Sequence, residues 1–242
     1  MTNRRLFLFF VANSCALALS LSQKNAQCLI KICHHKDCVK RGGGETLLNT
    51  FRDLLPRGSD VTIERSGCQS QCGKGPNVSA VGYDGKEKTY FSVEDPTTAS
   101  AILDAVTGQE YSINLLVAAT FIVEAELAPS AAKKESILSS VISLSKGDPT
   151  LLNSFAHAHA LFLRADARLD MNPPNIEGAI EDAKLATGLA PDESKGWRVL
   201  AYAQEAIGNI EGAIDAFREW ARVDVSFSTK SKKEIERLSC LL

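Results

Sequence analysis

Residues 175–180 and 209–214 share one six-residue sequence, Asn-Ile-Glu-Gly-Ala-Ile, at a separation of 34 residues. An identity of this length at a fixed period indicates an internal repeat, in which each unit buries its apolar face against its neighbours. Apolar residues recur at helical spacing around both copies, and proline separates successive segments. The second half of the chain is therefore predicted to be a row of packed helices, over residues 113–127, 130–146, 151–169, 175–189, 195–207, 210–223 and 229–241.

The period and the packing residues resemble those of tetratricopeptide repeats. The last copy carries bulky and small residues where such a repeat packs them, at Trp197, Leu200, Ala201, Gly208, Ala213 and Phe217. The middle copy is longer and the first copy, residues 113–149, matches poorly. The resemblance implies an all-α TPR-like domain over residues 112–242, whose groove would bind a partner protein. By the 34-residue register, five residues fall near groove-facing positions, although a solvated polar face would explain them equally well: Asn153, Arg164, Lys195, Arg198 and Tyr202.

Strands and helices alternate in the first half of the chain. A loop from residue 34 to residue 44 follows the first predicted strand, and Asp84-Gly85 joins two strands into a hairpin. Pro56 ends one amphipathic helix, while Asp95-Pro96 begins the second, which ends near Gly108. The predicted order is β-α-β-β-β-α, with strands at 28–33, 60–66, 78–83 and 88–93 and helices at 45–55 and from Pro96 to about 107.

Four of the seven cysteines form two close pairs. Four residues separate Cys33 from Cys38, and three separate Cys68 from Cys72, which begins the run Cys-Gly-Lys-Gly-Pro-Asn-Val. These spacings and this run resemble thioredoxin-like [2Fe-2S] ferredoxins, a family that includes the small cluster-bearing subunit of respiratory complex I. The resemblance implies an α+β thioredoxin-like domain over residues 27–109. It also implies one [2Fe-2S] cluster held by Cys33, Cys38, Cys68 and Cys72.

A [2Fe-2S] cluster needs four thiolates, which two separate loops can supply. Gly73 and Gly75 would let the backbone approach the cluster and direct N–H groups at its sulfurs. Structural zinc, two disulfides and a dithiol enzyme remain open alternatives for the same cysteines. His34 and His35 are interpreted as solvated loop residues, and Cys28 has no assigned role. His157 and His159 are interpreted as packing residues, since positions two apart on a helix face different directions.

The N-terminal residues 1–22 are predicted to be a signal or targeting segment. Arg4 and Arg5 precede an apolar stretch from residue 6 to residue 21, and small residues allow cleavage after Ala18. The apolar stretch is shorter than the roughly 20 residues of a membrane span, so no stable span is expected after processing. The signal and the iron-sulfur cluster together predict that the protein is located in a plastid. The alternative location is the secretory pathway.

Charge and motifs narrow the possible functions. A formal net charge of -2 without a basic stripe argues against a nucleic-acid partner. Nucleotide-binding and hydrolase motifs do not occur, so no intrinsic catalysis beyond electron transfer is expected. The first hypothesis is an electron carrier or redox adaptor that meets a redox partner and docks to protein through its repeats. The second is an assembly or scaffold protein whose cysteine domain is structural.

Overall fold

The computed structural model describes residues 28–241 and divides them into two compact units. The first unit contains the residues up to Leu48, Asp60–Glu94 and Ala101–Glu110. The second contains Asn49–Ser59, Asp95–Ser100 and the chain from Tyr111 onward. The predicted targeting segment, residues 1–22, lies outside the described residues.

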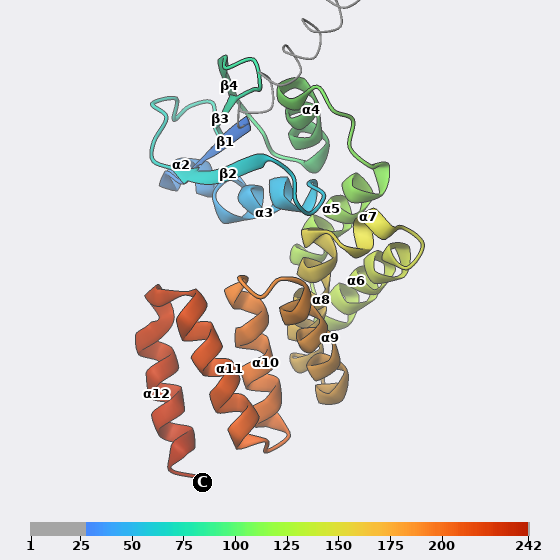
Figure 1. Ribbon diagram of the computed structural model, residues 1–242, viewed down its shortest axis with the longest axis vertical. Helices are drawn as coiled ribbons and strands as arrows, with labels where there is room; N and C mark the ends of the chain where they lie inside the picture. The colour runs from blue at the N-terminus through green and yellow to red at the C-terminus, as the bar shows by residue number, and fades with distance from the viewer. Residues whose placement is uncertain (1–27, 242) are drawn as a thin grey trace, which may run out of the picture. The chain divides into compact units, whose positions relative to one another are not determined.

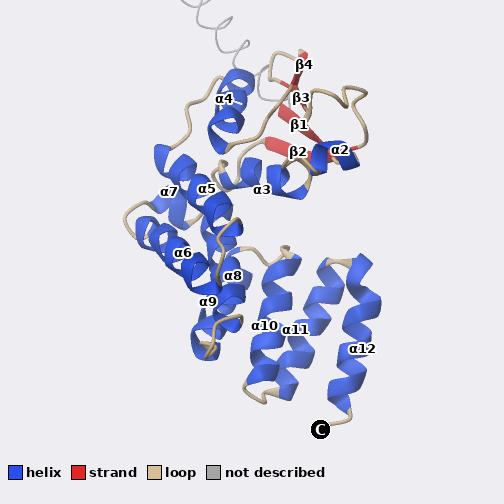
Figure 2. Ribbon diagram, turned by 180° about the vertical axis from the view of Figure 1, so that it is seen from behind, coloured by secondary structure: helices blue, strands red, loops and turns tan. Residues whose placement is uncertain are grey.

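A four-stranded mixed sheet forms the centre of the first unit (Figure 2). Its strands lie in the order β2-β1-β3-β4, with β1 parallel to β2 and antiparallel to β3, and with β3 antiparallel to β4. All four predicted strands are present, although the two hairpin strands are shorter than expected. The strands are β1 (Cys28–Cys33), β2 (Val61–Ser66), β3 (Val78–Val81) and β4 (Glu87–Tyr90).

Strand alternation gives this sheet one apolar face. Ile30 pairs with Ile63 on β2 and with Ala80 on β3, while Ile32 pairs with Val78. Because side chains alternate along a strand, these residues share a face. Ile30, Ile32, Val78 and Ala80 are fully buried, so this face supplies the core of the unit.

Two helices agree with the sequence prediction and one was not predicted. Helix α3 (Glu45–Asp53) and helix α4 (Pro96–Thr107) lie where expected, and the Asp95 carboxylate caps α4 by accepting a hydrogen bond from the Thr98 backbone N–H at 2.9 Å. The short helix α2 (Lys36–Val39) occupies the segment predicted as a loop. One turn of helix gives little periodic signal, which explains why the sequence prediction missed it.

Helices make up the chain beyond residue 112 (Figure 1). The predicted helix over residues 151–169 is wrong in one respect, because the chain forms two helices there. Asp148 caps the first, with Pro149 at its first position, and the Ser154 hydroxyl caps the second by accepting from the His157 N–H at 3.3 Å. The helices are α5 (Ile113–Glu126), α6 (Ala131–Ser145), α7 (Pro149–Leu152), α8 (Phe155–Leu169), α9 (Ile176–Leu189), α10 (Ser194–Ala206), α11 (Ile210–Val223) and α12 (Ser228–Ser239).

Neighbouring helices pack as consecutive pairs: α8 with α9, α9 with α10, α10 with α11, and α11 with α12. Their buried residues form two apolar clusters. The first draws mainly on α5, α6 and α8, and includes Leu138 and Leu161. The second draws mainly on α9, α10 and α11, and includes Phe217 and Trp220. Each helix therefore buries its apolar stripe against its neighbours in sequence, as a repeat array does.

The duplicated hexapeptide has the same local structure in both copies. The Asn175 side chain caps α9 by accepting from the Gly178 N–H at 3.0 Å, and Asn209 caps α11 through the Gly212 N–H at 3.2 Å. A Cβ atom on Gly212 would lie 2.5 Å from the Asn209 Nδ2 atom. Glycine three residues after the asparagine thus leaves room for the cap, which accounts for the shared sequence.

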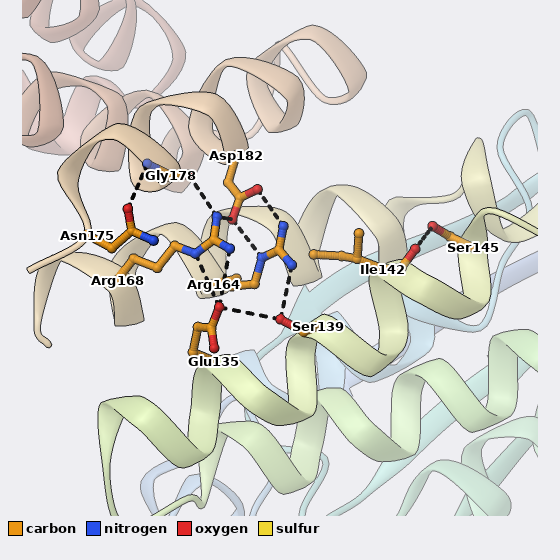
Figure 3. A network of polar contacts seen from close by, with 9 residues as sticks. All are labelled: Glu135, Ser139, Ile142, Ser145, Arg164, Arg168, Asn175, Gly178 and Asp182. Atoms are coloured by element: carbon orange, nitrogen blue, oxygen red, sulfur yellow. Dashed lines mark hydrogen bonds and ion pairs between the residues drawn. The ribbon is translucent and has the colours of Figure 1, made fainter.

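A partly buried ionic network joins α6, α8 and α9 (Figure 3). Asp182 accepts two hydrogen bonds from Arg164, both at 2.7 Å, and one from Arg168 at 2.9 Å. Arg168 also bonds Glu135, and Arg164 donates to the Ser139 hydroxyl. The Arg164 side chain is only 14% exposed, so the alternative of a solvated position is wrong for this residue.

Candidate metal centre

The first cysteine pair lies where β1 passes into α2. Cys33 is the last residue of β1, and its N–H donates to the Asn77 carbonyl at 3.1 Å. Cys38 lies within α2. Both residues are about 1% exposed, so this pair is the buried half of the site.

The second pair lies in the loop between β2 and β3, and both of its cysteines are exposed. The Sγ atoms of Cys68 and Cys72 are 3.4 Å apart, well beyond the roughly 2.05 Å of a disulfide bond. The Ser70 N–H points at the Cys68 sulfur at 3.4 Å, with Ser70 in the left-handed region at φ 61°. Gln69 fixes the loop to β1 by donating to the Lys31 carbonyl at 3.0 Å.

The sheet topology explains why the two loops meet. Strands β1 and β2 are parallel, so the segments that follow them leave the sheet at the same edge. Arg41 connects the two loops by donating to the Gly73 carbonyl at 3.1 Å. The loops that carry the two cysteine pairs therefore leave the sheet at the same edge.

The buried Cys38 side chain leaves no space for a side chain at position 75, which is glycine. A Cβ atom on Gly75 would lie 2.6 Å from the Cys38 Sγ atom, closer than real side chains approach. Gly43 is similarly confined, since its Cβ would lie 2.8 Å from the Cys38 carbonyl oxygen. A Cβ on Gly73 would meet nothing within 4 Å. The peptide bond between Gly75 and Pro76 is cis.

The pKa values of Cys38 and Cys72 are raised. Burial raises the pKa of Cys38, and its hydrogen bond with Cys33 raises it further. The hydrogen bond with Cys68 is the main cause of the raised pKa of Cys72. Several thiolates cannot form side by side without a neighbouring cation, because each opposes the next. The donor set is therefore suited to a thiophilic metal group, which would displace the protons on binding.

His35 is the site residue that sequence reasoning missed. Its Nδ1 atom lies 3.9 Å from the Cys72 Sγ atom, and the donor atoms of His35, Cys68 and Cys72 all lie within 4.8 Å of one another. His34 is engaged elsewhere, with its Nδ1 atom 3.0 Å from the Ile32 carbonyl. The available signal was the position of His35 between two cysteines, immediately before α2.

The remaining described cysteines are Cys28 and Cys240. Cys28 begins β1 and Cys33 ends it, so five residue steps of about 3.3 Å place them roughly 16 Å apart. Cys28 is fully buried, and burial raises its pKa. Cys240 is exposed at the end of α12.

The other histidines and the predicted groove residues have partners within the second unit. His157 contacts the Leu152 carbonyl through Nδ1 at 2.8 Å, and His159 pairs with the buried Asp53 carboxylate at 2.9 Å. The packing interpretation is confirmed, with a buried hydrogen-bond contact to Asp53 added at His159. Four further groove candidates also have contacts: Asn153 with the Pro149 carbonyl, Lys195 with the Phe162 ring, Arg198 with Asp166 and Tyr202 with the Phe217 ring.

No family model matches this sequence, and no curated protein matches it. Among the residues that the structure describes, no helix is both long and apolar enough to cross a membrane.

Proposed function

We propose that this protein binds one [2Fe-2S] cluster through Cys33, Cys38, Cys68 and Cys72 and acts as a one-electron carrier or redox adaptor. The observation that supports the proposal is that both cysteine pairs lie on loops that follow a parallel strand pair and leave the sheet at the same edge. The strand order and the confined Gly75 support a thioredoxin-like ferredoxin domain. All four donors are sulfur, which favours iron-sulfur chemistry or zinc over hard cations.

When bound, such a cluster supplies reversible one-electron transfer. The chain would bind the cluster between one buried and one exposed pair of cysteines. Cys33 and Cys38 lie in the core and exclude water from one side, whereas Cys68 and Cys72 face solvent. An electron-transfer partner would therefore approach over the loop that holds the exposed pair. The Ser70 N–H directed at Cys68 would stabilise negative charge on that sulfur.

The helical part would serve as a docking module of the tetratricopeptide type. Its support is the 34-residue duplication, together with the identical asparagine caps of α9 and α11. Helical repeats bind proteins through extended surfaces, so this part would recruit the enzyme or complex that uses the electron.

Reconstitution is the decisive experiment for this proposal. Protein purified without oxygen, or incubated with iron and sulfide, should contain about two iron and two acid-labile sulfide per chain. It should absorb in the visible range and give a rhombic electron paramagnetic resonance signal after reduction. Stoichiometric zinc that persists without labile sulfide after incubation with iron and sulfide would contradict the cluster.

That contrary result would favour the second candidate, a scaffold protein with a structural zinc site. The observation that supports it is the same set of two cysteine pairs on neighbouring loops, because structural zinc also accepts four thiolate ligands. Metal analysis of the purified protein distinguishes the two candidates.

A further inference from the structure

We propose that His35, Cys68 and Cys72 form a separate binding site for a single thiophilic divalent cation such as Zn²⁺, which is available when no cluster is present. This site uses only the exposed half of the centre together with an imidazole. It does not require Cys33 or Cys38, and it does not depend on the cluster proposed above.

The distances between the three donor atoms suit one tetrahedral ion. Zinc bonds of about 2.3 Å to sulfur and 2.0–2.1 Å to nitrogen place two sulfurs about 3.8 Å apart, and a sulfur and a nitrogen about 3.6 Å apart. The Cys68 and Cys72 sulfurs are 3.4 Å apart, and the Cys72 sulfur is 3.9 Å from His35 Nδ1. Side-chain movements of a few tenths of an ångström would close these two differences, and the third pair, the Cys68 sulfur and His35 Nδ1, lies within 4.8 Å.

The Nδ1 atom of His35 has no short competing bond. Its nearest contacts within the loop are the Asp37 N–H and the Asp37 carboxylate, both at 3.5 Å. Both distances lie at the limit of a hydrogen bond. A cation at this position would gain the imidazole and the nearby negative charge of Asp37.

The exposed half of the centre is accessible to a cation from solvent, whereas the buried half is not. Cys68 and Cys72 are exposed, and the His35 side chain is 32% exposed, so a cation can enter from solvent. Cys33 and Cys38 are about 1% exposed. Three protein ligands on one ion leave a fourth position for water, which is the composition of an exchangeable rather than a closed site. Because the cation and the cluster would both bind Cys68 and Cys72, only one of them can be bound at a time.

The test is a cobalt titration of reduced, cluster-free protein, since Co²⁺ reports a tetrahedral thiolate site by its visible absorption. A Cys33→Ala/Cys38→Ala double variant should still bind one Co²⁺ per chain, and Zn²⁺ should displace it. Adding His35→Asn should weaken binding at least about tenfold. Asparagine is a good helix N-cap, so this change keeps the cap of α2 and removes the imidazole.

His34→Ala is the matched control, because His34 lies in the same loop and bonds the Ile32 carbonyl instead. It should leave the cobalt affinity unchanged. If the double variant does not fold, Cys38→Ala alone supports the same comparison of His35→Asn with His34→Ala. Cobalt binding that needs Cys33 and Cys38, or that is indifferent to His35→Asn, would overturn the inference. Cluster reconstitution of the unaltered chain is measured separately, so failure of the cluster and failure of this site give different results.

Discussion

The Cys38 sulfur occupies the space that a side chain on Gly75 would need, since a Cβ atom there would lie 2.6 Å from Sγ. We predict that Gly75→Ala displaces this sulfur and lowers the iron and sulfide content per chain. Overpacking of a buried site should also reduce the free energy of unfolding of the cluster-free protein by about 1–3 kcal/mol. Metal analysis and urea unfolding measure the two effects.

Gly67→Ala is the control for this substitution, because a Cβ on Gly67 meets nothing within 4 Å. It should change neither the cluster content nor the stability.

Gly73→Ala is informative for a different reason. A Cβ at Gly73 also has open space, so loss of the cluster without loss of stability would show that the cluster itself needs a glycine there. Normal cluster content in Gly75→Ala would contradict the proposed role of Cys38.

Replacing the cysteines one at a time should separate ligands from packing residues. Serine at Cys33, Cys38, Cys68 or Cys72 should remove or severely destabilise the cluster, since a serine hydroxyl is a far poorer ligand at neutral pH. Cys240→Ser should be neutral, because that residue is exposed. The iron content and the visible spectrum of each variant measure the effect.

Cys28→Ser should have a different signature from the four ligand variants. It should retain the cluster but destabilise the fold by about 1–3 kcal/mol, because it places a hydroxyl where the thiol is fully buried. Loss of the spectrum on changing Cys28, with retention on changing Cys33, would show that the first ligand pair is misassigned.

Local patterns predicted the strands, the longer helices and the two cysteine pairs. Alternation marked β2, and Asp95-Pro96 marked the start of α4, because both signals lie within a few residues. The missed features depend on residues far apart in the chain. His35 lies beside Cys72 because two loops meet at one sheet edge, and Arg164 is enclosed because Asp182 comes from another helix. Hydrophobic periodicity contains no information about such contacts.

The carboxylate of Asp182 should be essential to the helical part. Its side chain is 4% exposed and bonds both Arg164 and Arg168. Asp182→Ala would leave two partly buried guanidinium groups without this partner, at a cost of about 3–5 kcal/mol in the free energy of unfolding. Urea unfolding followed by circular dichroism measures this loss. Asp192→Ala, at an exposed position, should change stability by less than about 0.5 kcal/mol.

Asp148 should give the stability a defined dependence on pH. Its pKa lies below the usual value of 3.8, chiefly because the Asn114 side chain donates to its carboxylate at 2.9 Å. A lowered pKa in the folded state means that the carboxylate stabilises the fold above pH 3.8. This stabilisation is lost as the pH falls through the folded-state pKa.

Two substitutions at Asp148 separate its charge from its role as a cap. Asp148→Ala should cost about 1 kcal/mol at pH 7, because it removes the cap of α7. Asp148→Asn retains a capping side chain without the charge. Its difference from the unaltered chain, measured by unfolding of cluster-free protein, should shrink on acidification below pH 3.8. A difference that grows on acidification would contradict the assigned direction of the pKa.

The asparagine cap of α11 should reverse the usual effect of replacing glycine by alanine in a helix. Alanine is favoured over glycine by about 0.8–1.0 kcal/mol at an open helical position. Gly188→Ala in α9 should realise this gain, since a Cβ there meets nothing within 4 Å. At Gly212 the new Cβ would lie 2.5 Å from Asn209 Nδ2, so the cap must move and about 1 kcal/mol of its contribution is lost.

Gly212→Ala should therefore be neutral or destabilising, while Gly188→Ala stabilises the same array in the same unfolding experiment. The interaction with the cap is isolated by repeating Gly212→Ala in an Asn209→Ala background. There the asparagine amide is gone, so alanine at 212 should now stabilise the helix. Equal stabilisation at both glycines in the unaltered background would show that the cap does not require glycine. The duplicated sequence would then owe its glycine to some other constraint.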